Sequence, residues 1–114
     1  EIGYRIALSS PELAPIAESI LYHHERWDGT GYPLGLKGEN IPLISRIIAL
    51  ADAYDVMING RPYKKALDEA EVWREIEKCS GTQFDPDLVN KIKEAFRREQ
   101  LRLNLYINTF DAST

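Results

Sequence analysis

Cysteine, histidine and excess positive charge are all scarce in this chain of 114 residues, which has one cysteine, two histidines and a net charge of −4. The single Cys79 cannot form a disulfide within the chain, which excludes a small disulfide-stapled fold. The charge balance excludes a broad nucleic-acid-binding surface. No apolar run approaches the roughly 18 residues that cross a bilayer. We therefore expect a cytoplasmic chain that has no membrane segment of its own and binds no nucleic acid.

The length and the hydrophobic content of 44% fit one compact domain and not two. The chain opens with Glu1-Ile2-Gly3 and has no initiator Met, so we expect a piece of a larger protein. A membrane anchor elsewhere in that parent stays open.

The spacing of apolar residues indicates an all-α helical bundle, because no strand pattern occurs before residue 100. Ser10 is expected to cap a helix that has Pro11 at its first position, and Asp85 with Pro86 repeats this pattern at a later helix start. Asp68 with Glu71 resembles a capping box. Helices are expected over residues 1–9, 11–24, 42–59, 69–80 and 86–96.

Residues 101–107 alternate between apolar and polar side chains, which favours a strand if the segment is paired and a helix extension if it is not. Both interpretations stay open. Residues 97–114, which contain this segment, are expected to form a C-terminal extension of uncertain structure.

Both histidines, His23 and His24, are expected at the end of a helix, on either edge of its buried face, directly before a glycine-rich loop over residues 25–41. Adjacent helical residues point about 100° apart, so the pair suits two metal ions, or one ion and a substrate. A structural role, with both rings hydrogen-bonded to carbonyls, is an equally open interpretation.

Two acids, Asp52 and Asp55, fall on or near the apolar sector of the 42–59 helix. A buried carboxylate without a partner is costly, so both acids are expected to meet a cation or strong hydrogen-bond donors. The sector contains Ile44, Ile47, Ile48, Ala51 and Ile58.

Several motifs occur in a fixed order: the run from His23 to Pro33, the 46–55 helix segment, Arg61-Pro62-Tyr63-Lys64, and the run from Gly81 to Pro86. Over about residues 1–96, these motifs closely resemble the HD-GYP family, a branch of the HD-domain metal phosphohydrolases. The resemblance implies the C-terminal portion of an HD-domain-like, all-helical fold. It also implies hydrolysis of cyclic di-GMP to linear pGpG or GMP, with two or three iron or manganese ions that activate a water.

Carried over by position, the resemblance gives the matching residues distinct roles. His23, His24 and Asp52 match metal ligands, and Asp55 matches a structural acid. Arg61 and Lys64 match phosphate-binding cations, although a solvated turn is the plain alternative for this pair. The loop triplet expected beside the ligand is Gly31, Tyr32 and Pro33.

The family's His-Asp pair, the Lys after it, an earlier Glu and a further His are all expected upstream of Glu1. We therefore expect about half of a metal site, which is inactive alone. Val72, Ile76 and Cys79 fall on the core face of the 69–80 helix, so Cys79 is expected to be an inert buried thiol. The rival functions are a non-catalytic, cyclic-dinucleotide-sensing or protein-docking module, and hydrolysis of another nucleotide phosphoester. Expected partners are a receiver or other sensory domain, a GGDEF-domain protein, or a second copy bound through exposed apolar surface.

Overall fold

The computed structural model describes residues 2–112, and it describes side chains as far as residue 109. Within that range the regular structure is helical, with no strand, so the prediction of an all-α fold is confirmed. The α-helices are α1 (Ile2–Leu8), α2 (Ala14–Leu21), α3 (Leu43–Asn59), α4 (Glu69–Lys78) and α5 (Pro86–Ala112). Two 3₁₀ turns, η1 (Tyr22–His24) and η2 (Gly38–Asn40), lie between α2 and α3.

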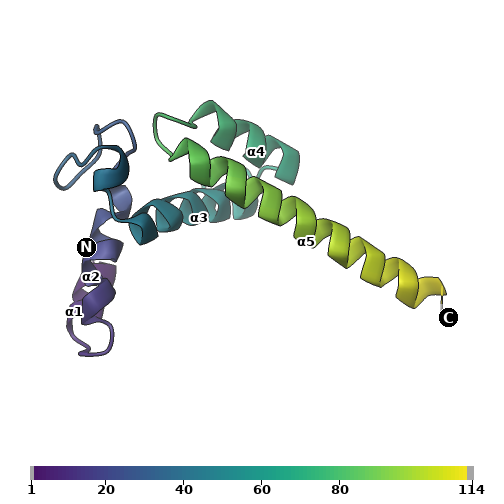
Figure 1. Cartoon of the computed structure of the whole chain (residues 1–114), viewed down its shortest axis with the longest axis horizontal. Coiled ribbons are helices and arrows are strands. Elements are labelled where there is room, and N and C mark those ends of the chain that lie inside the picture. The colour runs from purple at the N-terminus through teal and green to yellow at the C-terminus, as the bar shows by residue number, and fades with distance from the viewer. Residues whose placement is uncertain (1, 113–114) are drawn as a thin grey trace.

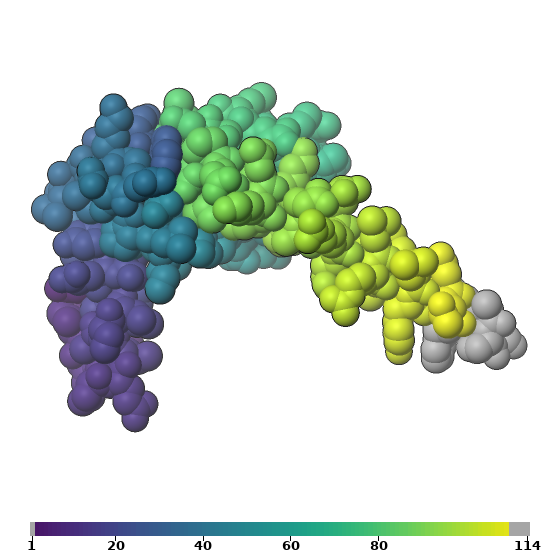
Figure 2. All heavy atoms as spheres, viewed as in Figure 1, coloured from purple at the N-terminus to yellow at the C-terminus, as the bar shows by residue number. Residues whose placement is uncertain are grey.

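The molecule is elongated, with extents of 54 × 35 × 32 Å. Its radius of gyration is 17.1 Å, against about 13 Å for a compact chain of this length. Figure 1 shows the reason: α1 and α2 form an arm on one side of the body, and the last turns of α5 project from the other. The space-filling view in Figure 2 shows the same two arms and the broader body between them.

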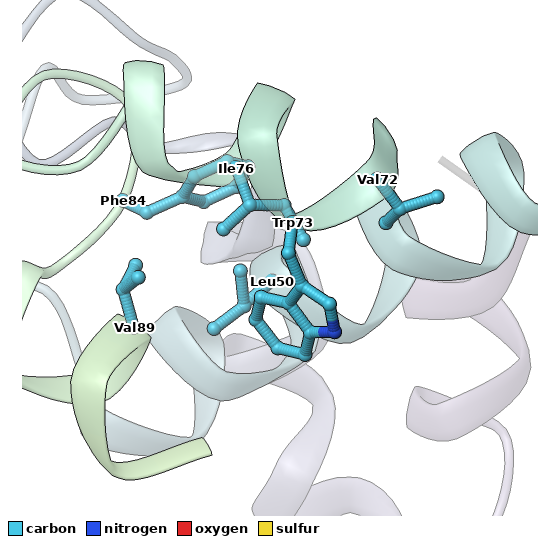
Figure 3. Packing of buried hydrophobic residues seen from close by; sticks show 6 residues of the cluster. All are labelled: Leu50, Val72, Trp73, Ile76, Phe84 and Val89. Carbon is cyan, nitrogen blue, oxygen red and sulfur yellow. The ribbon is translucent and has the colours of Figure 1, made fainter. Parts of the chain in front are cut away.

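The body is held together by one apolar core between α3, α4 and the first turns of α5 (Figure 3). Val72 and Ile76, predicted to face the core from α4, are fully buried there. Cys79, predicted to be buried with them, is only half-buried, because it follows α4 at its C-cap. The core cluster consists of Leu50, Val72, Trp73, Ile76, Phe84 and Val89.

Two helix starts follow local sequence signals. The predicted capping box is present, since the Asp68 carboxylate accepts a bond from the Glu71 N–H at 2.8 Å and Glu71 reaches back to the Asp68 N–H. At the start of α5, one oxygen of Asp85 accepts from the Asp87 N–H at 2.9 Å. The other Asp85 oxygen accepts from the Arg46 guanidinium at 2.7 Å, and that ion pair is largely buried. The pair therefore fixes α5 against α3.

The predicted start of α2 is wrong by three residues. Residues 10–13 form a turn in which the Ser10 carbonyl accepts from the N–H groups of Leu13 at 3.1 Å and Ala14 at 2.9 Å. The helix begins at Ala14, and Pro15 takes the place in the first turn that we assigned to Pro11. Both prolines suit a first turn, so composition alone did not separate them.

The predicted inner face of α3 is also wrong. Ile44 is 51% exposed and Ile47 is 39% exposed, and Asp55 is exposed as well. The buried positions are Ser45, whose hydroxyl donates to a carbonyl of α2, and Leu50. The face that α2, α4 and α5 cover therefore lies beside the most apolar sector and does not coincide with it.

The open question at residues 101–107 is answered by α5, which continues as one helix to Ala112. Leu101, Leu103 and Leu105 are each at least half exposed, because this part of α5 extends past the body (Figure 1). Their alternation with polar residues therefore reflects no sheet. The division into residues 1–96 and 97–114 stays a prediction. No helix within residues 2–112 combines the length and the apolar character needed to cross a membrane.

Candidate functional site

The two histidines lie on the 3₁₀ turn that ends α2, and both are half-buried. The ring centroids of His23 and His24 are 3.9 Å apart, with planes inclined by 39°. His23 Nδ1 contacts the carbonyl of Ile20, one turn earlier. After His24 the backbone becomes extended at Glu25, so the pair stands where the chain leaves the helix.

The loop after the histidines folds back onto them. Tyr32 donates its N–H to the His24 carbonyl at 3.4 Å, and its ring stacks on the His24 imidazole with centroids 4.8 Å apart and planes 12° from parallel. The peptide bond between Tyr32 and Pro33 is cis. A Cβ on Gly31 would lie 2.5 Å from the His24 carbonyl oxygen and 2.5 Å from the Arg26 nitrogen, which no side chain can tolerate. This close return of the backbone requires glycine.

Backbone bonds tie the same loop to the turn after α4. Trp27 donates its N–H to the Gln83 carbonyl at 3.1 Å, and Asp28 donates its N–H to the Thr82 carbonyl at 2.8 Å. The Asp28 carboxylate accepts from the hydroxyl and the N–H of Thr30, at 2.6 and 3.0 Å. These bonds, the hydroxyl first, hold the pKa of Asp28 below its ordinary value. The two backbone bonds to Thr82 and Gln83 therefore anchor the start of the loop, and they do not depend on exposed side chains.

A cavity of about 540 Å³ lies between this loop, α3 and the end of α4. It brings together the three predicted metal ligands His23, His24 and Asp52, with Tyr32 at the same wall. Asp52 is exposed, so the argument that a buried carboxylate must meet a cation does not apply to it. The other polar or sulfur-bearing side chains that line the cavity are Glu25, Arg26, Met57, Glu75, Cys79 and Gln83.

The donor atoms suit iron or manganese in type, since imidazole nitrogen and carboxylate oxygen are ordinary ligands of both. Their number is insufficient. Among the side chains that the structure describes, those of residues 2–109, no three of histidine, cysteine, aspartate or glutamate lie close enough together to hold one ion. The described part of the chain thus offers donor atoms of the right kind for part of a metal site, but too few for a whole one.

The predicted phosphate-binding cations do not line this cavity. Arg61 and Lys64 are both exposed and face each other across a tight turn after α3, where each donates its N–H to the other's carbonyl, at 2.9 and 3.0 Å. Lys64 lines a second cavity of about 420 Å³, together with Arg74. Met57 and Glu75 line both cavities, so the second adjoins the first.

Comparison with known proteins places the chain in a family. Residues 2–88 match the family model described as HD domain. The chain belongs to the HD domain family. The resemblance seen in its motifs is confirmed at this level, and the match runs from α1 into the first turn of α5.

The relatives of this HD domain are phosphodiesterases by name. A "Cyclic di-GMP phosphodiesterase" of Thermotoga maritima is 44% identical over 108 residues, covering 87% of this chain and 29% of the relative. A "3'3'-cGAMP-specific phosphodiesterase 2" of Vibrio cholerae is 38% identical over 87 residues, covering 75% of this chain and 17% of the relative. The chain thus spans less than a third of the length of these relatives.

A solved structure supports the same fold. The crystal structure of a cyclic GMP-AMP-specific phosphodiesterase from Vibrio cholerae, V-cGAP3, matches with a TM-score of 0.65 and 34% identity. The match covers 82% of this chain and 21% of that one. The all-α arrangement described above is therefore similar to that of one part of V-cGAP3.

Sequence reasoning missed several residues of the site in this HD domain. Glu25 was not singled out, yet it is 4% exposed and holds the loop that carries Tyr32. Cys79 and Gln83 line the cavity, and Cys79 was assigned only to the core. The only sequence signal for Glu25 was its position directly after the histidine pair. That position does not distinguish a buried glutamate from an exposed one, because a charged residue beside a glycine-rich loop is commonly exposed.

Proposed function

We propose that the protein containing this chain is a metal-dependent phosphodiesterase that hydrolyses cyclic di-GMP, and that the chain supplies the C-terminal part of its active site. The observation that carries the proposal is the cavity of about 540 Å³, because His23 and His24 from η1 and Asp52 from α3 all line it. The names of the relatives support the reaction class and the substrate.

In this proposal His23, His24 and Asp52 hold part of a cluster of two or three divalent ions, iron or manganese, and the remaining ligands come from outside this sequence. When bound, the ions supply a Lewis acid that activates water for attack on phosphorus. The chain's own residues bind and orient the substrate. Arg61 and Lys64 take the non-bridging phosphate oxygens, and the Gly31-Tyr32-Pro33 loop lies beside the ligand. The chain alone is expected to be inactive.

The charge distribution supports these roles for Arg61 and Lys64. The chain has a net charge of −4, so an anionic dinucleotide needs local cations. Both side chains are exposed, at a turn that backbone bonds hold in place. A guanidinium and an ammonium bind phosphate oxygens with charge-assisted hydrogen bonds. The expected products are linear pGpG or GMP.

The test uses the full-length protein purified with Mn²⁺. His23→Ala, His24→Ala and Asp52→Ala are each expected to lower bound metal, measured by elemental mass spectrometry, and to abolish hydrolysis of cyclic di-GMP, measured by chromatography of the products. Asp55→Ala is the matched control, because Asp55 lies on the same helix, is exposed and bonds to Asn59. Unchanged metal content in the three variants contradicts the ligand assignment.

The second candidate is a non-catalytic module that senses cyclic dinucleotides or docks a protein. It is favoured by one observation: no three candidate ligand side chains converge on one point within residues 2–109, where side chains are described. Calorimetry of the full-length protein with cyclic di-GMP separates the two candidates. Binding without turnover in the presence of Mn²⁺ or Fe²⁺ supports the sensor. Turnover of 3'3'-cGAMP in preference to cyclic di-GMP would instead change the substrate within the phosphodiesterase proposal.

We further propose a cytoplasmic location and regulation by a receiver or other sensory domain, or by a GGDEF-domain protein. Self-association through exposed apolar surface is a separate proposal. It is supported by Leu103, Tyr106 and Ile107, which are exposed and lie on one face of the projecting part of α5, because they are spaced i, i+3 and i+4. Contiguous apolar side chains on a soluble surface commonly mark a contact with another protein.

A further inference from the structure

Glu25 is the most deeply buried charged residue near the histidines, with 4% of its surface exposed. Its two carboxylate oxygens accept separate backbone bonds from the far side of the loop: Oε1 from the Leu34 N–H at 2.6 Å and Oε2 from the Leu36 N–H at 3.0 Å. A buried carboxylate is costly unless strong donors satisfy it, and here two donors do so. Both bonds cross the loop, so Glu25 joins its beginning to residues 34–36.

The segment that Glu25 closes carries Tyr32, whose ring stacks on His24. Tyr32 is 61% exposed, so little other packing holds its ring in place. What fixes it is the backbone on either side. Before Tyr32, the backbone at Gly31 packs so closely on Glu25 that a Cβ built on Gly31 would lie 2.7 Å from the Glu25 Cα. After Tyr32, the Leu34 N–H is held by the Glu25 carboxylate.

We propose that Glu25 is a positioning residue that clamps the loop so that Tyr32 stays stacked on His24 and holds the imidazole in its orientation toward the cavity. The stacked ring restricts rotation of the imidazole, and the clamp restricts movement of the stacked ring. Glu25 acts through Tyr32: it lies at the cavity wall, but the Leu34 and Leu36 amides occupy both of its carboxylate oxygens. The catalytic consequence rests on the proposed function, in which His24 is a ligand, whereas the structural consequence does not.

The first experiment measures the structural consequence on metal-free, full-length protein. Diethylpyrocarbonate acylates imidazole, and peptide mass spectrometry separates His24 from His23. Glu25→Gln is expected to raise the acylation rate of His24 severalfold. The amide has one acceptor oxygen and turns its N–H₂ group toward the second backbone donor, so one of the two bonds that hold the loop is lost. Hydrogen exchange at the Leu34 and Leu36 amides is expected to rise with it. Glu39→Gln is the control, because it makes the same chemical change at an exposed position of the same loop.

A double-variant cycle separates clamping through Tyr32 from general destabilisation. Tyr32→Ala removes the stack directly and is expected to raise the acylation rate at His24 as Glu25→Gln does. The double variant is expected to match the single variants, because both changes remove the same contact. Independent, multiplying effects contradict the clamp.

The second experiment measures the catalytic consequence in the Mn²⁺-loaded protein. Glu25→Gln is expected to lower kcat for cyclic di-GMP on the order of tenfold to a hundredfold, with a smaller change in KM. Misplacement of a catalytic group by about 1 Å lowers the rate by a factor of that order. Circular dichroism checks the fold of each variant. If Glu25→Gln does not fold, Glu25→Asp, whose shorter arm cannot reach both amides, replaces it. If neither folds, the Tyr32→Ala variant decides, because its ring is exposed.

The outcomes keep the two proposals apart. A wild-type protein that hydrolyses no cyclic dinucleotide overturns the proposed function, and the acylation and exchange rates still decide on Glu25. Unchanged acylation of His24 in Glu25→Gln, or in Tyr32→Ala, overturns the clamp even if the wild type is a fast phosphodiesterase.

Discussion

Replacement of Gly31 by alanine tests whether the loop's return over the histidines is as close as the structure indicates. The φ angle of Gly31 is not positive, so an alanine meets no backbone strain there. It meets atoms instead. The added Cβ would lie 2.5 Å from the Arg26 nitrogen, 2.5 Å from the His24 carbonyl oxygen and 2.7 Å from the Glu25 Cα. All three are backbone atoms, so no side-chain rotation relieves the contact.

The expected loss of stability follows from these contacts. Overpacking of a well-packed region costs about 1–3 kcal/mol, and three backbone contacts place this case near 3 kcal/mol. Gly38→Ala is the matched control in the same loop. Gly38 has a φ of +59° and no atom within 4 Å of the built Cβ, so its cost is the left-handed backbone alone, about 1 kcal/mol.

The assay is urea unfolding of the 114-residue chain, followed by the helical circular dichroism signal. With a slope of about 2 kcal/mol per molar urea, the midpoint is expected to fall by roughly 1.5 M for Gly31→Ala and 0.5 M for Gly38→Ala. A Gly31→Ala midpoint equal to the wild type, or a larger loss for Gly38→Ala, refutes the reasoning. Either result would mean that the loop does not return onto His24 as closely as described.

Asp85→Ala leaves the buried Arg46 guanidinium without its carboxylate and is expected to cost about 3–5 kcal/mol in denaturant unfolding; a loss below 1 kcal/mol contradicts the buried pair. Thr30→Val is expected to raise the pKa of Asp28 toward its ordinary value, measured by NMR titration, because the hydroxyl is the first cause of the lowering. Since the folded pKa is the lower one, the stability linked to Asp28 is present above the ordinary value and lost as the pH falls through the folded pKa. Leu103→Asp, on the projecting part of α5, is expected to shift sedimentation from dimer toward monomer, and a wild type that is monomeric at all concentrations removes that proposal.

The sequence predicted helix ends well where the signal is local. The capping box at Asp68 and the cap at Asp85 depend on N–H groups two or three residues away, so the same residues appear in the sequence and in the bond. The start of α2 was predicted wrongly because no local side-chain signal marks it. Pro11 and Pro15 offer the same local signal, and the turn at Ser10 decides between them through backbone bonds that composition does not encode.

The covered face of α3 could not be predicted from periodicity. A helical wheel identifies the apolar sector, but coverage depends on where α2, α4 and α5 arrive, and those directions are set by loops. Ile44 and Ile47 therefore stay largely exposed, while Ser45 is buried because its hydroxyl reaches a carbonyl of α2 at 2.7 Å. The motif resemblance predicted more of the site than periodicity did, because it matched His23, His24 and Asp52 to one site. All three line one cavity, although 27 residues separate His24 from Asp52 in the sequence.

The acids around this cavity show how the fold assigns different tasks to one residue type. Glu25 is buried, and two backbone donors satisfy its carboxylate, so it is committed to holding the loop. Asp52 is exposed on the cavity wall, where water solvates it at no cost when no ion is bound. A ligand has to be available to the ion, and of these two acids only Asp52 is. Burial was therefore the wrong criterion for a metal-binding acid at this cavity: the buried Glu25 is already satisfied by backbone donors, and in the proposed function the exposed Asp52 is the acid left for the ion.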